Sequence, residues 1–177
     1  QKIGNFSGVT VDNKQGKINL SAIIEANLID FPGTYSLYPN SKDERVVLNV
    51  LSNPNDDDFP DVAIYLADAT NLEKHLLLLT QIKDLEIPAV LGLNMSDLVE
   101  KEQISIDEKK LSTFLGMPVV SISGRSGENL DKLKKAAFGL FQTKNENSKP
   151  FHKFSQKEQN IIEKIKAKFP APNNYQA

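Results

Sequence analysis

Three short apolar segments, residues 62–67, 89–93 and 118–122, recur through the middle of the chain, and helical patterns separate them. The segments are almost continuously apolar, which is typical of strands covered on both faces. Alternation of such strands with helices predicts a parallel sheet wrapped by right-handed crossover connections. We therefore expect an α/β fold in three layers, with helices on both faces of a mainly parallel sheet.

The first third of the chain predicts two adjacent strands, 17–20 and 22–29, joined by a tight connection. A helix is expected from about Lys42 to Leu51, because Ser41 is a suitable N-cap and acidic residues follow it in the first turn. Further helices are expected over 71–85, over the region up to 115 with a break near 103–107, over 130–141 and over 155–168.

The amino-acid composition excludes sites that depend on cysteine and argues against a nucleic-acid partner. The chain has 177 residues and no cysteine, which excludes disulfides, thiolate zinc sites and cysteine nucleophiles. Its 21 basic and 23 acidic side chains nearly balance, so no global field favours nucleic acid, and no nucleic-acid partner is expected. No run approaches the roughly 18 apolar residues that a membrane-spanning helix needs, so the chain as given is expected to be soluble.

Asp30 and Gly33 lie where the second predicted strand ends. In an open α/β sheet, ligands bind beyond the carboxyl ends of the strands, so a carboxylate at Asp30 is well placed to bind one. Gly33 leaves its backbone N–H open to close approach. An ordinary turn after a strand would give the same local pattern, and these residues alone do not separate the two interpretations.

Asn94 and Asp97 follow the second buried strand, and the segment Ser121-Ile122-Ser123-Gly124 ends the third. A carboxylate at Asp97 can accept both N–H donors on the Watson–Crick edge of guanine, a pair that adenine lacks. The Asn94 amide would approach the O6 and N7 side of the base and tie neighbouring loops. A backbone N–H of the last segment can donate to the guanine O6.

Phosphate and metal contacts are expected from the first part of the chain. Asp30 can hold Mg²⁺ through a bound water, and the Gly33 N–H can bind a γ-phosphate. Thr10, in the opening loop, is placed to add a hydroxyl to Mg²⁺ and a backbone N–H to the same phosphate.

Four motifs in this order resemble the G domain of the ferrous iron transport protein B family, within the Ras-like P-loop GTPases. The Gly-Asn-x-x-Gly-Val-Thr loop together with the Pro-Gly-Thr-Tyr-Ser-Leu run is highly specific. The similarity covers most of the chain through about Phe141. The motifs are Gln1-Lys2-Ile3-Gly4-Asn5-Phe6-Ser7-Gly8-Val9-Thr10-Val11, Asp30-Phe31-Pro32-Gly33-Thr34-Tyr35-Ser36-Leu37, Asp68-Ala69-Thr70-Asn71-Leu72-Glu73 and Leu93-Asn94-Met95-Ser96-Asp97.

The resemblance implies a guanine nucleotide site with GTP or GDP as ligand and Mg²⁺ as cofactor. Residues 4–10 would form switch I and residues 30 to about 43 switch II. No catalytic residue is certain, and Thr10 and Asp30 would face Mg²⁺. The implied nucleotide-binding residues are Thr10, Asp30, Gly33, Asn94, Met95, Asp97, Ser121, Ser123 and Gly124.

The same resemblance implies a G domain over 1–142, a linker over 143–154 and the beginning of a helical regulatory domain over 155–177. It further implies a GTPase whose GTP binding and slow hydrolysis regulate Fe(II) uptake. The expected partner is a membrane-embedded transporter domain of the same parent protein, which places this part at the cytoplasmic face of the inner membrane.

The main departure from the family pattern is the phosphate-binding loop, since no Gly-x-x-x-x-Gly-Lys-Ser/Thr motif occurs in these residues. We expect an upstream truncation that removes the first strand and this P-loop, so that the fragment binds nucleotide poorly. That strand would lie between those ending at Asp30 and Asp68, leaving two bare edges that rearrangement, a homo-oligomeric strand swap or residues outside this sequence would fill. Thr34 also stands where Ras-type enzymes have glutamine, which predicts slow hydrolysis.

Two alternatives to a GTPase domain of an iron transporter stay open. One is a regulatory or interaction module that is not competent to bind nucleotide. The other is a translation-factor-like GTPase, which would be expected to carry a basic RNA-binding domain that this sequence does not display.

Overall fold

The computed structural model describes residues 14–21, 23–143 and 150–168 of the chain. A parallel sheet of three strands forms its centre, in the order β3 (Ala63–Asp68), β4 (Ala89–Asn94) and β5 (Val119–Ser121). β3 pairs with β4 from Ala63 opposite Ala89 to Asp68 opposite Asn94, so both strands end at the same edge. The register places the polar residues that follow these strands side by side.

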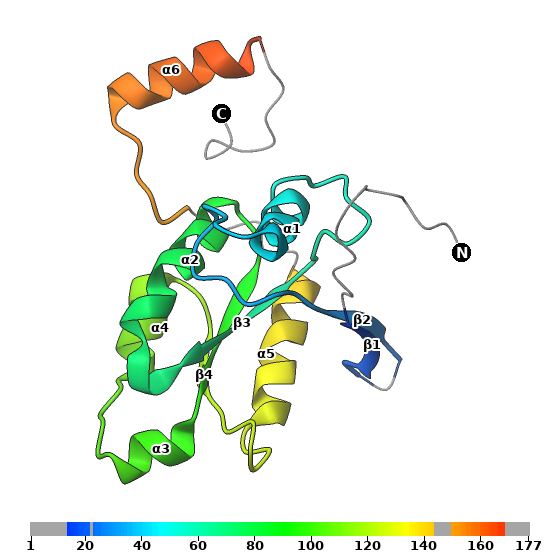
Figure 1. The fold of residues 1–177 in the computed structure, drawn as a ribbon, viewed down its shortest axis with the longest axis vertical. Coiled ribbons are helices and arrows are strands. Elements are labelled where there is room, and N and C mark those ends of the chain that lie inside the picture. The colour runs from blue at the N-terminus through cyan, green and yellow to red at the C-terminus, as the bar shows by residue number, and fades with distance from the viewer. Residues whose placement is uncertain (1–13, 22, 144–149, 169–177) are drawn as a thin grey trace.

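A separate antiparallel hairpin consists of β1 (Lys14–Asn19) and β2 (Glu25–Asp30). Its strands were expected at 17–20 and 22–29, so both lie a few residues from their predicted positions. Within the described residues, β2 pairs with β1 alone and β3 with β4 alone, and β2 and β3 do not pair with each other. Figure 1 shows the hairpin beside the parallel sheet. Leu28 on β2 and Leu66 on β3 are 46% and 53% exposed.

The helices begin and end close to where the sequence predicts them. α1 starts after Ser41, whose side chain accepts the Glu44 N–H while Glu44 reaches back to the cap, a reciprocal capping box. The expected helix over 71–85 begins as a short 3₁₀ turn, η1, because Asp68 caps that turn through the Thr70 N–H. The helical elements are α1 (Lys42–Leu51), η1 (Ala69–Asn71), α2 (Glu73–Asp84), α3 (Ser96–Lys101), α4 (Glu108–Leu115), α5 (Leu130–Thr143) and α6 (Gln156–Lys166).

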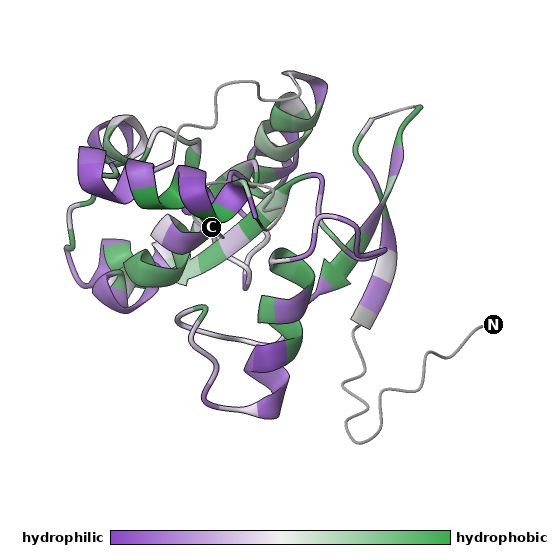
Figure 2. Ribbon diagram, turned by 90° about the horizontal axis from the view of Figure 1, so that it is seen from above, coloured by the Kyte–Doolittle hydropathy of each residue, from purple (hydrophilic) through white to green (hydrophobic). Residues whose placement is uncertain are grey.

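Apolar side chains cover both faces of the parallel sheet. On one face, Leu91 and Leu93 of β4 are fully buried in a cluster that includes residues of α1, α2 and α4. On the other face, Val90 packs with Ile122 and with Leu133 of α5. The helices show both hydrophobic and hydrophilic bands in Figure 2, as expected for helices with one buried side. This arrangement confirms the three-layer α/β fold.

α6 and the edge at which β3 and β4 end lie at opposite ends of the molecule (Figure 1). The loops around α3 are at the bottom of that view, and α6, in orange and red, is at the top. In the part of the chain that the structure describes, no helix is both long and apolar enough to cross a membrane. Residues 4–10, which the family resemblance assigns to switch I, lie outside the described residues.

Candidate functional site

The chain turns sharply where β4 ends, and this turn presents two of the predicted side chains. Met95 adopts the left-handed conformation, with φ of 71°, between the last residue of β4 and the first residue of α3. Left-handed backbone is uncommon for a residue with a Cβ, so this turn is a locally specialised feature. Asn94 and Asp97 lie on its two sides, and Met95 itself is 37% exposed.

Two hydrogen bonds that involve side chains join this turn to the loop that follows β5, beside a main-chain bond from the Ser96 N–H to the Ile122 carbonyl at 3.1 Å. The Gly124 N–H donates to Asn94 Oδ1 at 2.9 Å, and the Ser123 hydroxyl donates to Asp97 Oδ1 at 3.2 Å. The partners are 30 and 26 residues apart in sequence. The Asn94 amide therefore ties the two loops together, as the sequence predicts for it.

Residues 123–128 form a tight loop because several of its polar groups bond to one another. The Ser126 N–H donates to Ser123 Oγ at 3.2 Å and the Gly127 N–H to the Ser123 carbonyl at 2.9 Å. The Ser123 N–H donates to the Glu128 carbonyl at 3.2 Å. Gly127 has φ of +80°, a conformation that glycine adopts without strain. Ser123 is 1% exposed, so the loop holds its hydroxyl in a fixed position beside Asp97.

A cavity of about 230 Å³ opens between the two loops. The seven residues that line it are Asn94, Met95, Asp97, Leu98, Ser123, Gly124 and Arg125. Five of the predicted nucleotide-binding residues thus meet at one cavity. A sixth, Ser121, does not line it, and its backbone carbonyl accepts the Asn129 side-chain amide at 3.0 Å. The carboxylate, the amide and the apolar side chains together suit a flat heterocyclic base that carries hydrogen-bond donors.

A backbone N–H of residues 121–124 was expected to donate to an oxygen of the base, but two of these groups already have acceptors within the protein. Both the Ser123 N–H and the Gly124 N–H already donate within the protein, to Glu128 and to Asn94. A contact from either group to a base oxygen would therefore be shared with an existing hydrogen bond.

Asp30 and Gly33 are not among the residues that line this cavity. Asp30 is exposed at the end of β2, and a Cβ added at Gly33 would meet no atom within 4 Å. The contacts expected of Asp30 with a metal-bound water and of Gly33 with a phosphate stay predictions. Thr34 bonds locally, with its hydroxyl donating to the Ser36 carbonyl at 2.8 Å. Thr10 lies outside the described residues.

Three residues near the cavity had not been predicted. Arg125 and Leu98 line it, and Glu128 accepts the Ser96 hydroxyl at 3.2 Å, which adds a third bond that involves side chains between the two loops. Serines on both sides of a glycine in the sequence after β5 indicate a turn with internal bonds. That signal points to the loop, but it does not reveal which side chain reaches α3.

A small group of rings connects β3, α2 and the segment after Gly33. The Tyr65 hydroxyl and His75 Nδ1 lie 3.2 Å apart, and the Tyr35 ring is 5.4 Å from that of His75. Burial, and to a smaller extent Tyr35, raises the pKa of Tyr65 to about 12. At the end of the same strand, hydrogen bonds from Thr70 lower the pKa of Asp68. Asp68 is thereby kept ionised as the cap of η1.

Comparison with known proteins identifies the family. A family model described as ferrous iron transport protein B matches residues 1–137 of the chain. The chain belongs to this family. A FeoB Fe(2+) transporter of Leptospira biflexa is 41% identical over 134 residues, which is 76% of this chain and 19% of that protein. The corresponding transporter of Salmonella typhimurium is 39% identical over 140 residues, which is 77% of this chain and 18% of that protein.

Solved structures of FeoB domains share the fold. The cytosolic domain of the T. maritima FeoB iron transporter in its GMPPNP form superposes with a TM-score of 0.76 at 32% identity, covering 94% of this chain and 63% of that one. The FeoB G-domain of Methanococcus jannaschii gives a TM-score of 0.68 at 32% identity, covering 75% of this chain and 81% of that one. The predicted FeoB family and G-domain fold are therefore confirmed, and the chain spans under a fifth of the length of the two curated relatives described above.

Proposed function

We propose that this chain is the guanine-nucleotide-binding part of a ferrous iron transporter, in which GTP binding and slow hydrolysis regulate Fe(II) uptake. The observation that carries this proposal is the pair of hydrogen bonds that join Asn94 to Gly124 and Asp97 to Ser123 around one cavity. The FeoB family is a family of GTPases, and the T. maritima domain was solved with GMPPNP.

In the proposed base site, the exposed Asp97 carboxylate accepts the N1–H and the exocyclic amine of guanine. One of its oxygens already accepts the Ser123 hydroxyl, which fixes the orientation of the carboxylate before a ligand arrives. Because Asn94 Oδ1 accepts the Gly124 N–H, the NH₂ group of Asn94 is the part that can face O6 and N7 of the base. Adenine offers neither the donor pair nor the O6 acceptor, and it should bind much more weakly.

In the proposed phosphate site, Asp30 would hold Mg²⁺ through a bound water, the Thr10 hydroxyl would bind the same ion, and the Gly33 N–H would bind a phosphate. Bound Mg²⁺ would neutralise phosphate charge during transfer. The exposed carboxylate of Asp30 fits this role because Mg²⁺ prefers oxygen ligands and retains several waters. The sequence holds no P-loop motif, so we propose that this chain alone binds GDP little better than it binds guanosine.

We also propose that another strand completes the sheet beside β2 and β3. Supporting this, each of these strands pairs on one side only within the described residues, and each carries a half-exposed leucine, Leu28 or Leu66. Unpaired edges of this kind are ready templates for strand addition. If a second copy supplies the strand, light scattering should give a dimer mass that rises with concentration, whereas a monomer at all concentrations would reject exchange between copies.

The assembly proposed for the whole transporter includes a membrane-embedded domain of the same parent protein. The G domain would then work at the cytoplasmic face of the membrane, with residues 155–177 beginning a helical regulatory domain after the linker. Support for this comes from the Leptospira and Salmonella relatives, which are described as Fe(2+) transporters, and from the T. maritima structure, which is described as a cytosolic domain.

The experiment is a nuclear magnetic resonance titration of this chain with guanosine, GDP and adenosine up to millimolar concentration. Guanosine should shift the backbone signals of Asp97 and Gly124, GDP should bind only slightly better, and adenosine should leave both signals unchanged. The Asp97→Asn variant should lose the guanosine response. The matched control is Asp107→Asn at the N-cap of α4, a residue that does not line the cavity, and this variant should retain that response.

Absence of any guanosine response would contradict the base site and favour a module that does not bind nucleotide. Tight binding of GDP by this chain alone would instead contradict the argument about its phosphate contacts.

A further inference from the structure

Two buried polar side chains on α2 take no part in the nucleotide site. Among the described residues, the buried polar and charged side chains are Gln81, Asp84 and Ser123. Ser123 belongs to the cavity, whereas Gln81 and Asp84 are 5% and 6% exposed and lie in the last turn of α2. Burying such groups is unfavourable unless they form hydrogen bonds, so their partners indicate what they do.

Gln81 holds the segment that follows Gly33. Its Oε1 accepts the Leu37 N–H at 2.8 Å, a bond that spans 44 residues of sequence. The Leu37 side chain is 7% exposed and belongs to the same core cluster as Leu78 and Ile82 of α2. The ring contact between Tyr35 and His75 adds a second attachment to α2. Residues 35–37, in the proposed switch II, are therefore fixed to this helix through side-chain and main-chain contacts.

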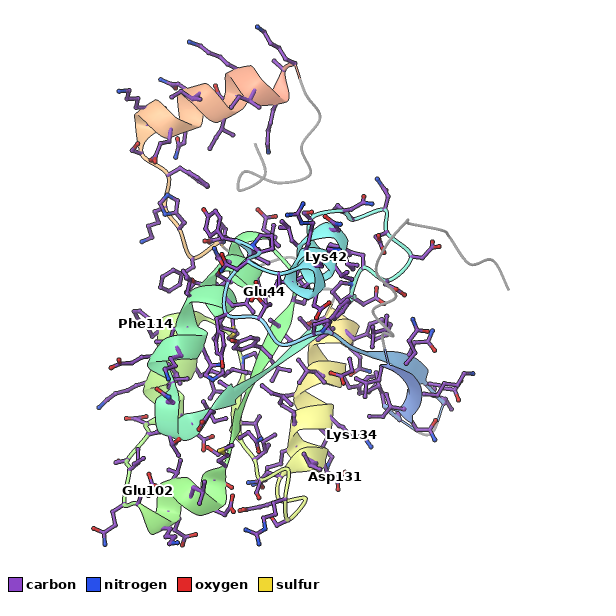
Figure 3. The ribbon with its side chains drawn as sticks, viewed as in Figure 1. Lys42, Glu44, Glu102, Phe114, Asp131 and Lys134 are labelled. Carbon is purple, nitrogen blue, oxygen red and sulfur yellow. The ribbon has the colours of Figure 1, made fainter. Side chains whose placement is uncertain are left out.

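Asp84 holds the segment that leads to α6. Its Oδ1 accepts the His152 N–H at 2.7 Å, across 68 residues of sequence. Next to this bond, the Phe151 ring meets the Phe114 ring of α4 edge to face, with centroids 5.5 Å apart. Lys83 donates to the carbonyl of Leu115 at the end of α4, which fixes α4 against the same turn. Figure 3 labels Phe114 on the side where the chain descends from α6.

The two attachments share one turn of helix. Residues three apart on a helix are neighbours on its surface, so Gln81 and Asp84 move together when α2 shifts or rotates. Each side chain accepts a main-chain N–H from a different segment, one in switch II and one before α6. Breaking either bond removes a hydrogen-bond donor from a buried acceptor, which is unfavourable, so a displacement of the turn at one bond also disturbs the other.

We propose that the last turn of α2 couples switch II to residues 150–154 and through them to α6. Movement of switch II that withdraws the Leu37 N–H releases Gln81, displaces the turn and loosens the Asp84 bond to His152. The effect runs equally in the reverse direction, because coupling between two sites is reciprocal. The inference rests on the proposed function only for the name and nucleotide response of switch II.

The two hydrogen-bonded amides report on the proposal directly. Hydrogen exchange of the Leu37 and His152 amides, followed residue by residue in this chain without nucleotide, measures how often each bond opens. Asp84→Ala should accelerate exchange at His152 by about tenfold to a hundredfold through loss of a charged acceptor. If the turn couples the segments, Leu37 exchange should also rise, by about threefold or more, the smallest change we count as coupling. Gln81→Met should produce the mirror pattern.

Ile82→Val is the matched control, since Ile82 lies in the same turn, is 5% exposed and belongs to the apolar core. In this variant the exchange rates of the Leu37 and His152 amides, each divided by the exchange rate of the buried Leu91 amide, should not change. The Leu91 amide serves as the reference because it monitors global opening. Phe151→Ala removes the ring contact with Phe114 and so weakens the attachment of residues 150–154 without altering the buried core. This variant should also accelerate exchange of the Leu37 amide. The proposal is overturned if each variant affects only its own amide, or if Ile82→Val reproduces the cross effect. Because no nucleotide is present, these outcomes are independent of the base-site test.

Discussion

Asn94 offers a substitution that should separate nucleotide binding from loop stability. Its Oδ1 accepts the Gly124 N–H at 2.9 Å, and its NH₂ group is the proposed contact to the base. Asn94→Asp keeps an acceptor of the same size for Gly124 but removes the donors and adds a negative charge. Asn94→Ala removes both functions.

The expected magnitudes differ between stability and binding. Because Gly124 is exposed, water can replace its lost partner, so Asn94→Ala should lower the free energy of unfolding by about 1 kcal/mol. Asn94→Asp should change it by no more than about 0.5 kcal/mol, since the N–H to carboxylate bond is retained and the added charge, at a half-buried position that lines an open cavity, stays in contact with water. Guanosine affinity should fall by about 30-fold in Asn94→Asp, as a carboxylate would face the acceptors O6 and N7.

Urea unfolding gives the first quantity, and titration of the Gly124 backbone signal with guanosine gives the second. The matched control is Asn49→Asp on the exposed side of α1, which should leave both unchanged. Guanosine binding by Asn94→Asp that equals the original protein would refute the assigned role of the NH₂ group. Equal destabilisation by both Asn94 variants would refute the retained bond to Gly124.

Three further predictions concern stability. The pKa of Tyr65 is raised from 10.0 to about 12, so the contribution of its neutral form to the free energy of unfolding is complete below pH 10 and is lost as pH rises toward 12. With partial exposure discounted, Tyr65→Phe should remove about 1 to 2 kcal/mol of this pH dependence, measured by urea unfolding at several pH values. An unchanged dependence of the free energy of unfolding on pH would contradict this prediction. Ser41→Ala should cost about 1 kcal/mol in thermal unfolding by removing the α1 capping box. Ser155→Ala removes the same kind of capping box from α6 but should cost less, because α6 buries one residue, Ile162, whereas α1 buries three; equal effects would contradict this difference in packing. Gly92→Ala should be tolerated within about 0.5 kcal/mol in urea unfolding, because the one close atom, Leu66 Cδ2 at 2.7 Å, ends a half-exposed flexible side chain; a loss above about 2 kcal/mol would show that Leu66 cannot move.

Local sequence signals predicted most elements of the fold. The apolar runs that became β3 and β4, the Ser41 cap of α1 and the break between α3 and α4 are all short-range features, and each lies within a few residues of its expected place. The strands of the hairpin were less well placed. Their residues alternate weakly between polar and apolar, so the pattern gives little information about register.

The base half of the candidate site was largely predictable, since Asn94, Asp97 and Ser123 each end or follow a buried strand and parallel strands end at one edge. The hydrogen bond from the Ser96 hydroxyl to Glu128 was not predictable, because it depends on how the loop after β5 folds over α3. The same limit applies to Gln81 and Asp84. In the sequence they are ordinary polar residues of an amphipathic helix, and nothing local indicates that both are buried.

The sequence by itself determined the α/β class, the order of strands and helices, and the residue types that could recognise guanine, because periodicity, caps and polar strand ends are local properties. Only the tertiary structure decided which polar groups meet. It joined Asn94 to Gly124, Leu37 to Gln81 and His152 to Asp84, pairs separated by 30, 44 and 68 residues. The physical reason is that a buried hydrogen bond depends on the packing of whole elements against one another, which no short segment specifies.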